Sequence, residues 1–195
     1  MNEPSASARI RAFLAVEIGE VARRSAADVS RSLRSRPGGD AVRWVRPESL
    51  HITLRFLGDV EPAIVPKLVA CVAEGVRGLE CFEARLVGVH GFPSARRPRV
   101  VVLDVAPREP LEALAAAVER GALAAGFAPE SRPFRPHLTL GRVRDPAAPD
   151  LEGAPEPALA PFPVREAVLF RSELRQSGAR YTPLERMALG RQPSP

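Results

Sequence analysis

Two of the chain's three histidines occupy the same four-residue frame. The frames run from His51 to Leu54 (His-Ile-Thr-Leu) and from His137 to Leu140 (His-Leu-Thr-Leu), and they hold two of the only three threonines. Near neutral pH, two imidazoles can offer one proton donor and one proton acceptor. Two threonine hydroxyls can hold the oxygens of an anion. The repeated frame therefore predicts a site for acid–base chemistry on a phosphate.

A β-strand would place the polar residues of each frame on one face, because side chains two residues apart share a side of the sheet. His51 then lies beside Thr53, and His137 beside Thr139, while the apolar residues of each frame enter the core. Within one strand the two polar side chains are roughly 7 Å apart, so neither pair can surround a phosphate alone. Two such strands facing each other could. One neutral imidazole would take a proton from the attacking oxygen, and the opposite imidazolium would protonate the leaving oxygen.

Two arginines follow the frames. Arg55 shares the parity of His51 and Thr53, so we expect it to face the same groove and to contact a phosphate. Arg142 has the parity of the buried leucines and would face the core, unless the strand bulges at Gly141. Both are candidate substrate-binding residues.

Aromatic residues precede both frames. Phe134 and Trp44 could each stack on a base or pack in the core, and we include Phe134 among the candidate substrate-binding residues. His90, the third histidine, has Phe92 where the frames have threonine, which indicates a structural or loop-lining residue.

The composition sets limits on the protein class. The chain has 195 residues and a formal charge of +5, which suits one domain, or two small lobes sharing a core, and is compatible with an RNA partner. Only one cation is lysine, so the charge also reflects a general preference for arginine. No apolar run of about 18 residues and no signal-peptide pattern occurs, which favours a cytoplasmic protein. No histidine, cysteine or carboxylate pattern has metal-ligand spacing, so we expect neither a metal nor a cofactor.

Hydrophobic periodicity predicts three helices, over about 20–34, 62–78 and 110–125. Apolar runs bounded by turn residues predict about eight strands, including one at 162–171, and residues 145–161 are expected to form a loop. The two frames stand in the first and the last third of the chain. This weak internal symmetry indicates a mixed α/β chain with two similar lobes facing each other.

Four segments together resemble one known family. They are residues 42–58 around the first frame, 92–100 with Phe-Pro-Ser and Arg-Pro-Arg-Val, 134–143 around the second frame, and 172–181 in the closing hairpin. They are similar to the RNA 2′,3′-cyclic phosphodiesterases of bacteria and archaea, also called 2′-5′ RNA ligases, within the 2H phosphoesterase superfamily. Arg55 stands where that family commonly has lysine.

The resemblance implies an α+β, bilobal and duplicated fold in which two antiparallel sheets line a central cleft, with helices on the outside. It predicts a single domain over residues 1–195, in which we expect 1–8 and 191–195 to be flexible tails. The implied reaction is hydrolysis of an RNA terminal 2′,3′-cyclic phosphate to a 2′-phosphomonoester, by a monomer that binds RNA 3′ ends.

The resemblance also assigns roles. His51 matches the proton donor to the leaving 3′ oxygen, and His137 the acceptor that activates water. Thr53 and Thr139 match the hydroxyls that hold the phosphate. Spacing alone does not distinguish the two histidines, because the frames are chemically equivalent. Three alternatives stay open: action on small cyclic nucleotides, action on 2′-5′ linkages (including RNA ligation), or a non-catalytic RNA- or nucleotide-binding module.

Overall fold

The computed structural model describes residues 8–94, 97–144, 150–158, 160–175 and 178–190. Apart from residue 8, the tails predicted at 1–8 and 191–195 lie outside these ranges. The helices are α1 (Glu20–Arg34), α2 (Val65–Arg77) and α3 (Arg108–Ala125). The strands are β1 (Ile10–Glu17), β2 (Val42–Trp44), β3 (His51–Val60), β4 (Phe82–Phe92), β5 (Val100–Ala106), β6 (His137–Val143), β7 (Phe162–Val164), β8 (Glu166–Arg175) and β9 (Gly178–Ala188).

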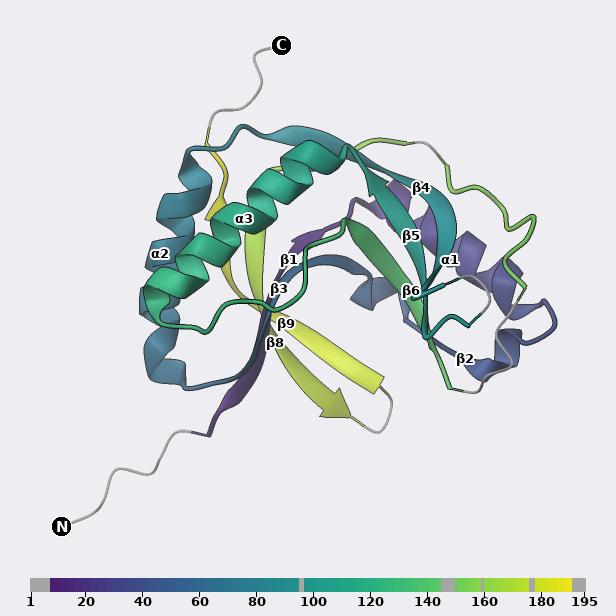
Figure 1. Ribbon diagram of the computed structural model, residues 1–195, viewed down its shortest axis with the longest axis horizontal. Coiled ribbons are helices and arrows are strands. Elements are labelled where there is room, and N and C mark those ends of the chain that lie inside the picture. The colour runs from purple at the N-terminus through teal and green to yellow at the C-terminus, as the bar shows by residue number, and fades with distance from the viewer. Residues whose placement is uncertain (1–7, 95–96, 145–149, 159, 176–177, 191–195) are drawn as a thin grey trace.

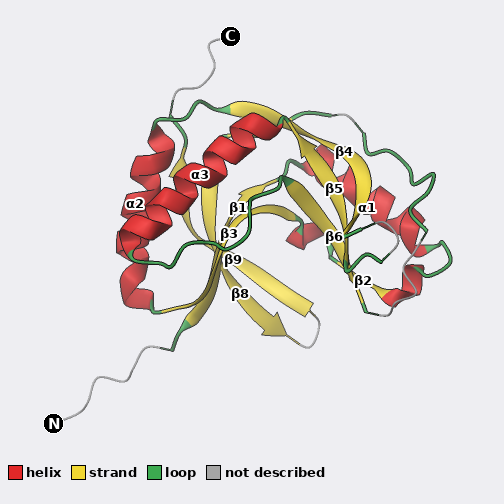
Figure 2. Ribbon diagram, in the orientation of Figure 1, coloured by secondary structure: helices red, strands yellow, loops and turns green. Residues whose placement is uncertain are grey.

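The strands form two antiparallel sheets. A four-stranded sheet has the order β3-β1-β8-β9, and a five-stranded sheet has the order β2-β6-β5-β4-β7. Helices α2 and α3 lie side by side on the outside of the first sheet, and α1 lies on the outside of the second (Figures 1 and 2). The predicted architecture, two antiparallel sheets with helices on the outside, is confirmed.

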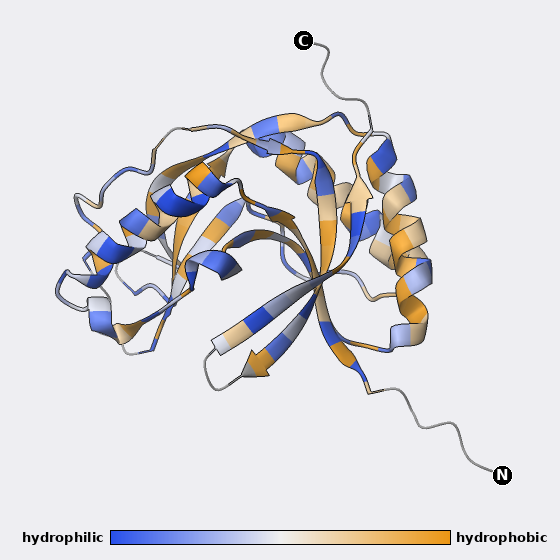
Figure 3. Cartoon of the chain, turned by 180° about the vertical axis from the view of Figure 1, so that it is seen from behind, coloured by the Kyte–Doolittle hydropathy of each residue, from blue (hydrophilic) through white to orange (hydrophobic). Residues whose placement is uncertain are grey.

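Each helix turns an apolar stripe to its sheet, as its periodicity predicts. In α1 the buried positions include Ala22, Ala26, Val29 and Leu33. Helices α2 and α3 approach so closely that a Cβ on Gly121 would lie 2.7 Å from the Cα of Val72. Hydrophobic segments accordingly gather where helices meet sheets (Figure 3). The large core lies between the helices and the outer face of each sheet. The inner faces, which point away from the helices, are therefore the ones that can carry the chemistry.

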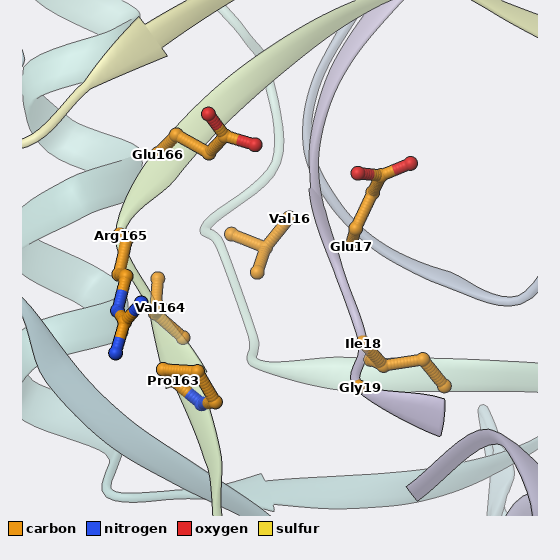
Figure 4. Close-up of a pocket in the computed structure, with 8 residues that line it drawn as sticks. All are labelled: Val16, Glu17, Ile18, Gly19, Pro163, Val164, Arg165 and Glu166. Carbon is orange, nitrogen blue, oxygen red and sulfur yellow. The ribbon is translucent and has the colours of Figure 1, made fainter. Parts of the chain in front are cut away.

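The chain crosses between the two sheets more than once. The predicted single strand at 162–171 is wrong: β7 pairs with β4 in the five-stranded sheet, and after Arg165 the chain continues as β8 in the other sheet. Beside this crossing, β1 leaves the four-stranded sheet through Ile18 and Gly19. The two crossings line a hollow of about 340 Å³ (Figure 4).

An ion-pair group joins the strands at this seam. Arg186 of β9 lies 2.7 Å from Glu17 of β1 and also pairs with Glu166 of β8. Glu17 is the cross-strand partner of His51, so the seam fixes the end of the sheet at which the first frame begins.

Candidate active site

Both frames form strands with the predicted alternation. In β3, Ile52 and Leu54 are buried in the main core, and His51 and Thr53 are half-buried on the other face. In β6, the two leucines of the frame are fully buried and the histidine and threonine are half-buried. Strands β3 and β6 belong to different sheets but contact each other (Figure 1). The two frames are therefore brought together from distant parts of the chain.

The imidazole of His51 is held on three sides. Its Nδ1 lies 2.8 Å from the carbonyl oxygen of Ser49, to which it donates when Nδ1 carries the proton. The rings of Phe13 and Tyr181 lie 4.7 and 5.0 Å from its centroid. Burial lowers the pKa of His51, the bond to Ser49 opposes that effect, and the charge of His137 lowers the pKa further. The nitrogen left for chemistry is Nε2.

His137 is anchored in the same way. Its Nδ1 lies 2.7 Å from the carbonyl oxygen of Arg135, again two residues earlier in the chain. The ring of Phe92 lies 6.1 Å from its centroid. Because each carbonyl fixes Nδ1 as the protonated nitrogen, both histidines present Nε2 as the atom that can accept or, once charged, donate a proton. The two rings stand on strands β3 and β6, which belong to different sheets and contact each other.

Arg142 faces the inner side because β6 bulges. The register between β5 and β6 shifts after Val101, so that Thr139 pairs with Val102 while Arg142 pairs with Val100. Gly141 stands at the bulge, where β2 approaches so closely that a Cβ would clash with the side chain of Val42. The bulge brings the exposed Arg142 to the face that carries the second frame.

Arg55 does not face that side, and the prediction that it shares the face of His51 is wrong. The register between β1 and β3 shifts so that Ala15 pairs with Thr53 but Leu14 pairs with Arg55. This bulge turns the arginine under α3, where it is only 6% exposed. Its Nη1 lies 3.1 Å from Glu119 and 3.4 Å from Glu130, and its Nη2 donates to the carbonyl oxygen of Ala128. Arg55 is a buried structural cation.

The aromatic residues that precede the frames pack in the core. Phe134 is half-buried against the main core, and so is Trp44, whose Nε1 donates to the carbonyl oxygen of Gly39 at 2.8 Å. Of the two roles left open for Phe134, stacking on a base and packing in the core, the structure shows the packing.

Sequence reasoning missed the rings that lie around His51. Phe13, Phe170 and Tyr181 form a cluster on the inner face of the four-stranded sheet, in which the phenylalanine rings stack at 5.3 Å. Only strand parity could have indicated them, and parity does not say which strands become neighbours.

His90 also lies on an inner face. It pairs across the strands with Val102, the neighbour of Thr139, and its Nδ1 lies 2.6 Å from the carboxylate of Asp104. Its side chain is 61% exposed. This exposure is more typical of a residue that lines the site than of one that supports the fold.

Comparison with known proteins agrees with this geometry. Residues 22–176 match the model of the 2′-5′ RNA ligase superfamily. An RNA 2′,3′-cyclic phosphodiesterase of Methanothermobacter thermautotrophicus is 36% identical over 91% of this chain and 97% of its own length. A protein of the same name from Thermus thermophilus is 34% identical over 92% of this chain and 90% of its own.

A solved structure has a similar fold. Escherichia coli LigT complexed with 3′-AMP matches 94% of this chain and 99% of its own, with a TM-score of 0.76 and 28% identity. Two sheets that each carry a His-x-Thr strand on the inner face, together with these relatives, define the class of 2H phosphoesterases. Within that class, the chain belongs to the 2′-5′ RNA ligase superfamily. None of the described helices is long and apolar enough to cross a membrane.

Proposed function

We propose that this protein hydrolyses the 2′,3′-cyclic phosphate at an RNA 3′ end to a 2′-phosphomonoester, without a metal ion. One observation carries the proposal. Two histidines from different sheets, each with Nδ1 held by a backbone carbonyl, lie on strands β3 and β6, which contact each other. The relatives named RNA 2′,3′-cyclic phosphodiesterase support the choice of substrate.

The reaction needs two proton transfers. Nε2 of His137 accepts a proton from water as the water oxygen attacks phosphorus. The bond from phosphorus to the 3′ oxygen breaks, and Nε2 of His51 donates a proton to that oxygen. The products are a free 3′-hydroxyl and a 2′-phosphomonoester, and each proton transfer typically contributes about 10²–10⁴-fold.

Three neutral or cationic groups are proposed to hold the phosphate. The hydroxyls of Thr53 and Thr139 lie on the same strands and faces as the histidines, and the guanidinium of Arg142 lies beyond the second frame. A guanidinium on a non-bridging oxygen offsets the charge that develops there. The cyclic phosphate is strained and already placed, so the site must supply proton transfer and charge stabilisation rather than a metal-bound nucleophile.

The remaining parts of the proposal concern the whole protein. We propose that residues 1–195 act as one bilobal domain, because strands of both sheets alternate along the chain. We also propose that the protein is a cytoplasmic monomer that acts on RNA 3′ ends.

The test is incubation with an oligoribonucleotide ending in a 2′,3′-cyclic phosphate, with EDTA present. We expect turnover to a 2′-phosphate. His51→Ala and His137→Ala should each reduce kcat/KM by about 10²-fold or more, because each removes a proton carrier. Lys67→Ala, which removes one exposed charge from α2, is the control and should leave kcat/KM nearly unchanged. A 3′-phosphate product, or no turnover, would contradict the proposal.

A further inference from the structure

Three arginines from both sheets lie within electrostatic range of Tyr181. Arg11 of β1 and Tyr181 of β9 both pair with Ser172 of β8, so they share one row of the four-stranded sheet. Arg43 of β2 and Arg142 of β6 are directly opposite each other in the five-stranded sheet. The charges of all three arginines act on the phenol of Tyr181.

The two sheets touch at this point. A Cβ on Gly178, at the start of β9, would lie 4.0 Å from Nη2 of Arg43. Arg46, just after β2, donates to the carbonyl oxygen of Ala179 at 3.1 Å. These contacts hold β2 against β9, so the arginines of one sheet and the tyrosine of the other keep their relative positions.

Arg11 has an acidic cross-strand neighbour, Asp59, but among the described residues neither Arg11 nor Arg43 nor Arg142 forms an ion pair. In the described part of the chain, no carboxylate lies within ion-pair distance of Arg11, Arg43 or Arg142, although many other arginines are paired, such as Arg9 and Arg186. Like charges directly opposite each other in a sheet are unfavourable. An anion bound among them would remove that repulsion.

The group adjoins the reacting site. Tyr181 packs edge-on against the ring of His51, with the ring planes at 88°. The same ring packs edge-on against Phe13 at 4.9 Å, and its phenol is subject to the charges of the three arginines. Burial raises the pKa of Tyr181, which keeps the hydroxyl protonated at neutral pH and able to donate a hydrogen bond to an anion.

We propose that Arg11, Arg43 and Tyr181 bind the phosphodiester immediately 5′ of the terminal nucleotide. The inference rests on the proposed function and specifies its substrate class: an RNA chain of at least two nucleotides is preferred over a cyclic mononucleotide. Arg142, which lies between the second frame and Arg43, closes the subsite toward the reacting phosphate.

The test compares two substrates that differ by this phosphodiester. One is adenosine 2′,3′-cyclic phosphate, and the other is the adenosine dinucleotide with the same terminal ring. A charged hydrogen bond to a phosphate contributes at least about 10-fold in affinity, so kcat/KM should favour the dinucleotide by about 10-fold or more. A neutral methylphosphonate in place of the internal phosphate should remove the preference.

Variants locate the subsite. Arg11→Ala and Arg43→Ala should each lower the dinucleotide-to-mononucleotide ratio of kcat/KM several-fold, and Tyr181→Phe should lower it while keeping the ring. Arg120→Ala, which removes one exposed charge from α3, is the matched control and should keep the ratio.

The outcomes are separable. Hydrolysis of both substrates with a ratio near one, or with a ratio insensitive to Arg11→Ala and Arg43→Ala, overturns the subsite and leaves the proposed function intact. If neither substrate is hydrolysed, the proposed function fails, and calorimetry with the dinucleotide ending in a 2′-phosphate decides the subsite. Binding that Arg43→Ala and the methylphosphonate both weaken about 10-fold supports it, and binding that neither weakens overturns it.

Discussion

Replacing Arg55 by methionine distinguishes a structural cation from a substrate-binding one. The variant keeps an unbranched apolar stem and removes the guanidinium that pairs with Glu119 and Glu130. If Arg55 held substrate phosphate, the variant would lose activity. Because its guanidinium is buried under α3 instead, we expect a loss of stability.

The magnitude follows from burial. Removing one partner of a buried ion pair typically costs 3–5 kcal/mol, because the other charge stays buried and unpaired. Here the carboxylate left behind is not fully buried, since the side chain of Glu119 is 26% exposed and that of Glu130 is 38% exposed. Arg55 Nε and Glu119 Oε2 also form no hydrogen bond, which reduces the pair's contribution. We therefore expect a loss of about 2–3 kcal/mol, which lowers the Tm of a chain of this size by about 4–12 °C.

The assay is thermal unfolding followed by circular dichroism, with kcat/KM measured well below the transition. Arg24→Met is the matched control: it breaks an ion pair to Glu20 of 2.9 Å whose side chains are 75% and 62% exposed, so it should cost less than about 1 kcal/mol. Adding Glu119→Gln to Arg55→Met should recover part of the loss. A normal Tm together with a large fall in kcat/KM would refute the structural role.

Two further predictions concern titration. Two interacting histidines give a bell-shaped pH profile of kcat/KM, and its acidic limb reports the lower of the two pKa values. Because burial lowers the pKa of His51, the midpoint of this acidic limb should lie below about pH 6.5. An NMR titration of His51 in the free protein with a midpoint at or above that value would contradict this. Tyr181 is the only tyrosine, so absorbance at 295 nm follows the ionisation of this residue alone. Because burial raises the pKa of Tyr181, the midpoint of this titration should lie above about 10 in the folded protein and return to about 10 on unfolding. Arg43→Ala removes a charge that lowers this pKa and should raise the midpoint further, whereas an unchanged midpoint would place Arg43 away from the phenol.

The alternation of the two frames could be predicted because it needs only the two-residue period of a strand. The arginines that follow could not, because each lies beyond a bulge. One extra residue reverses the face of every later side chain, so Arg55 turned outward and Arg142 turned inward. Gly141 gave a visible signal for the second bulge. The first bulge depends on how β3 pairs with β1, and nothing in the sequence around Leu54 marks it.

The surroundings of the histidines depend on contacts between distant segments. The sheet order places β8 beside β1 and β9 beyond β8, and Tyr181 of β9 thereby comes next to Phe13. Each sheet contains strands from both halves of the chain, so the two similar lobes expected from the repeated frames are interleaved in sequence. Strand parity identifies which residues share a face, but register across more than a hundred residues is set by the folded core. Arg11 and Arg43 were therefore invisible as site residues.

The contacts between distant segments also give the two equivalent frames different surroundings. Each histidine has Nδ1 on the carbonyl oxygen two residues earlier, so local structure makes them alike. The rings of Phe13 and Tyr181 enclose His51, and this burial disfavours its charged form. An anionic substrate acts in the opposite direction, because its negative charge favours the imidazolium. His51 would then take up its proton as the phosphate binds, which suits a group that donates to the leaving oxygen. The acid role proposed for His51 thus depends on the charge of the substrate acting against the aromatic enclosure, and neither is contained in the His-x-Thr frame.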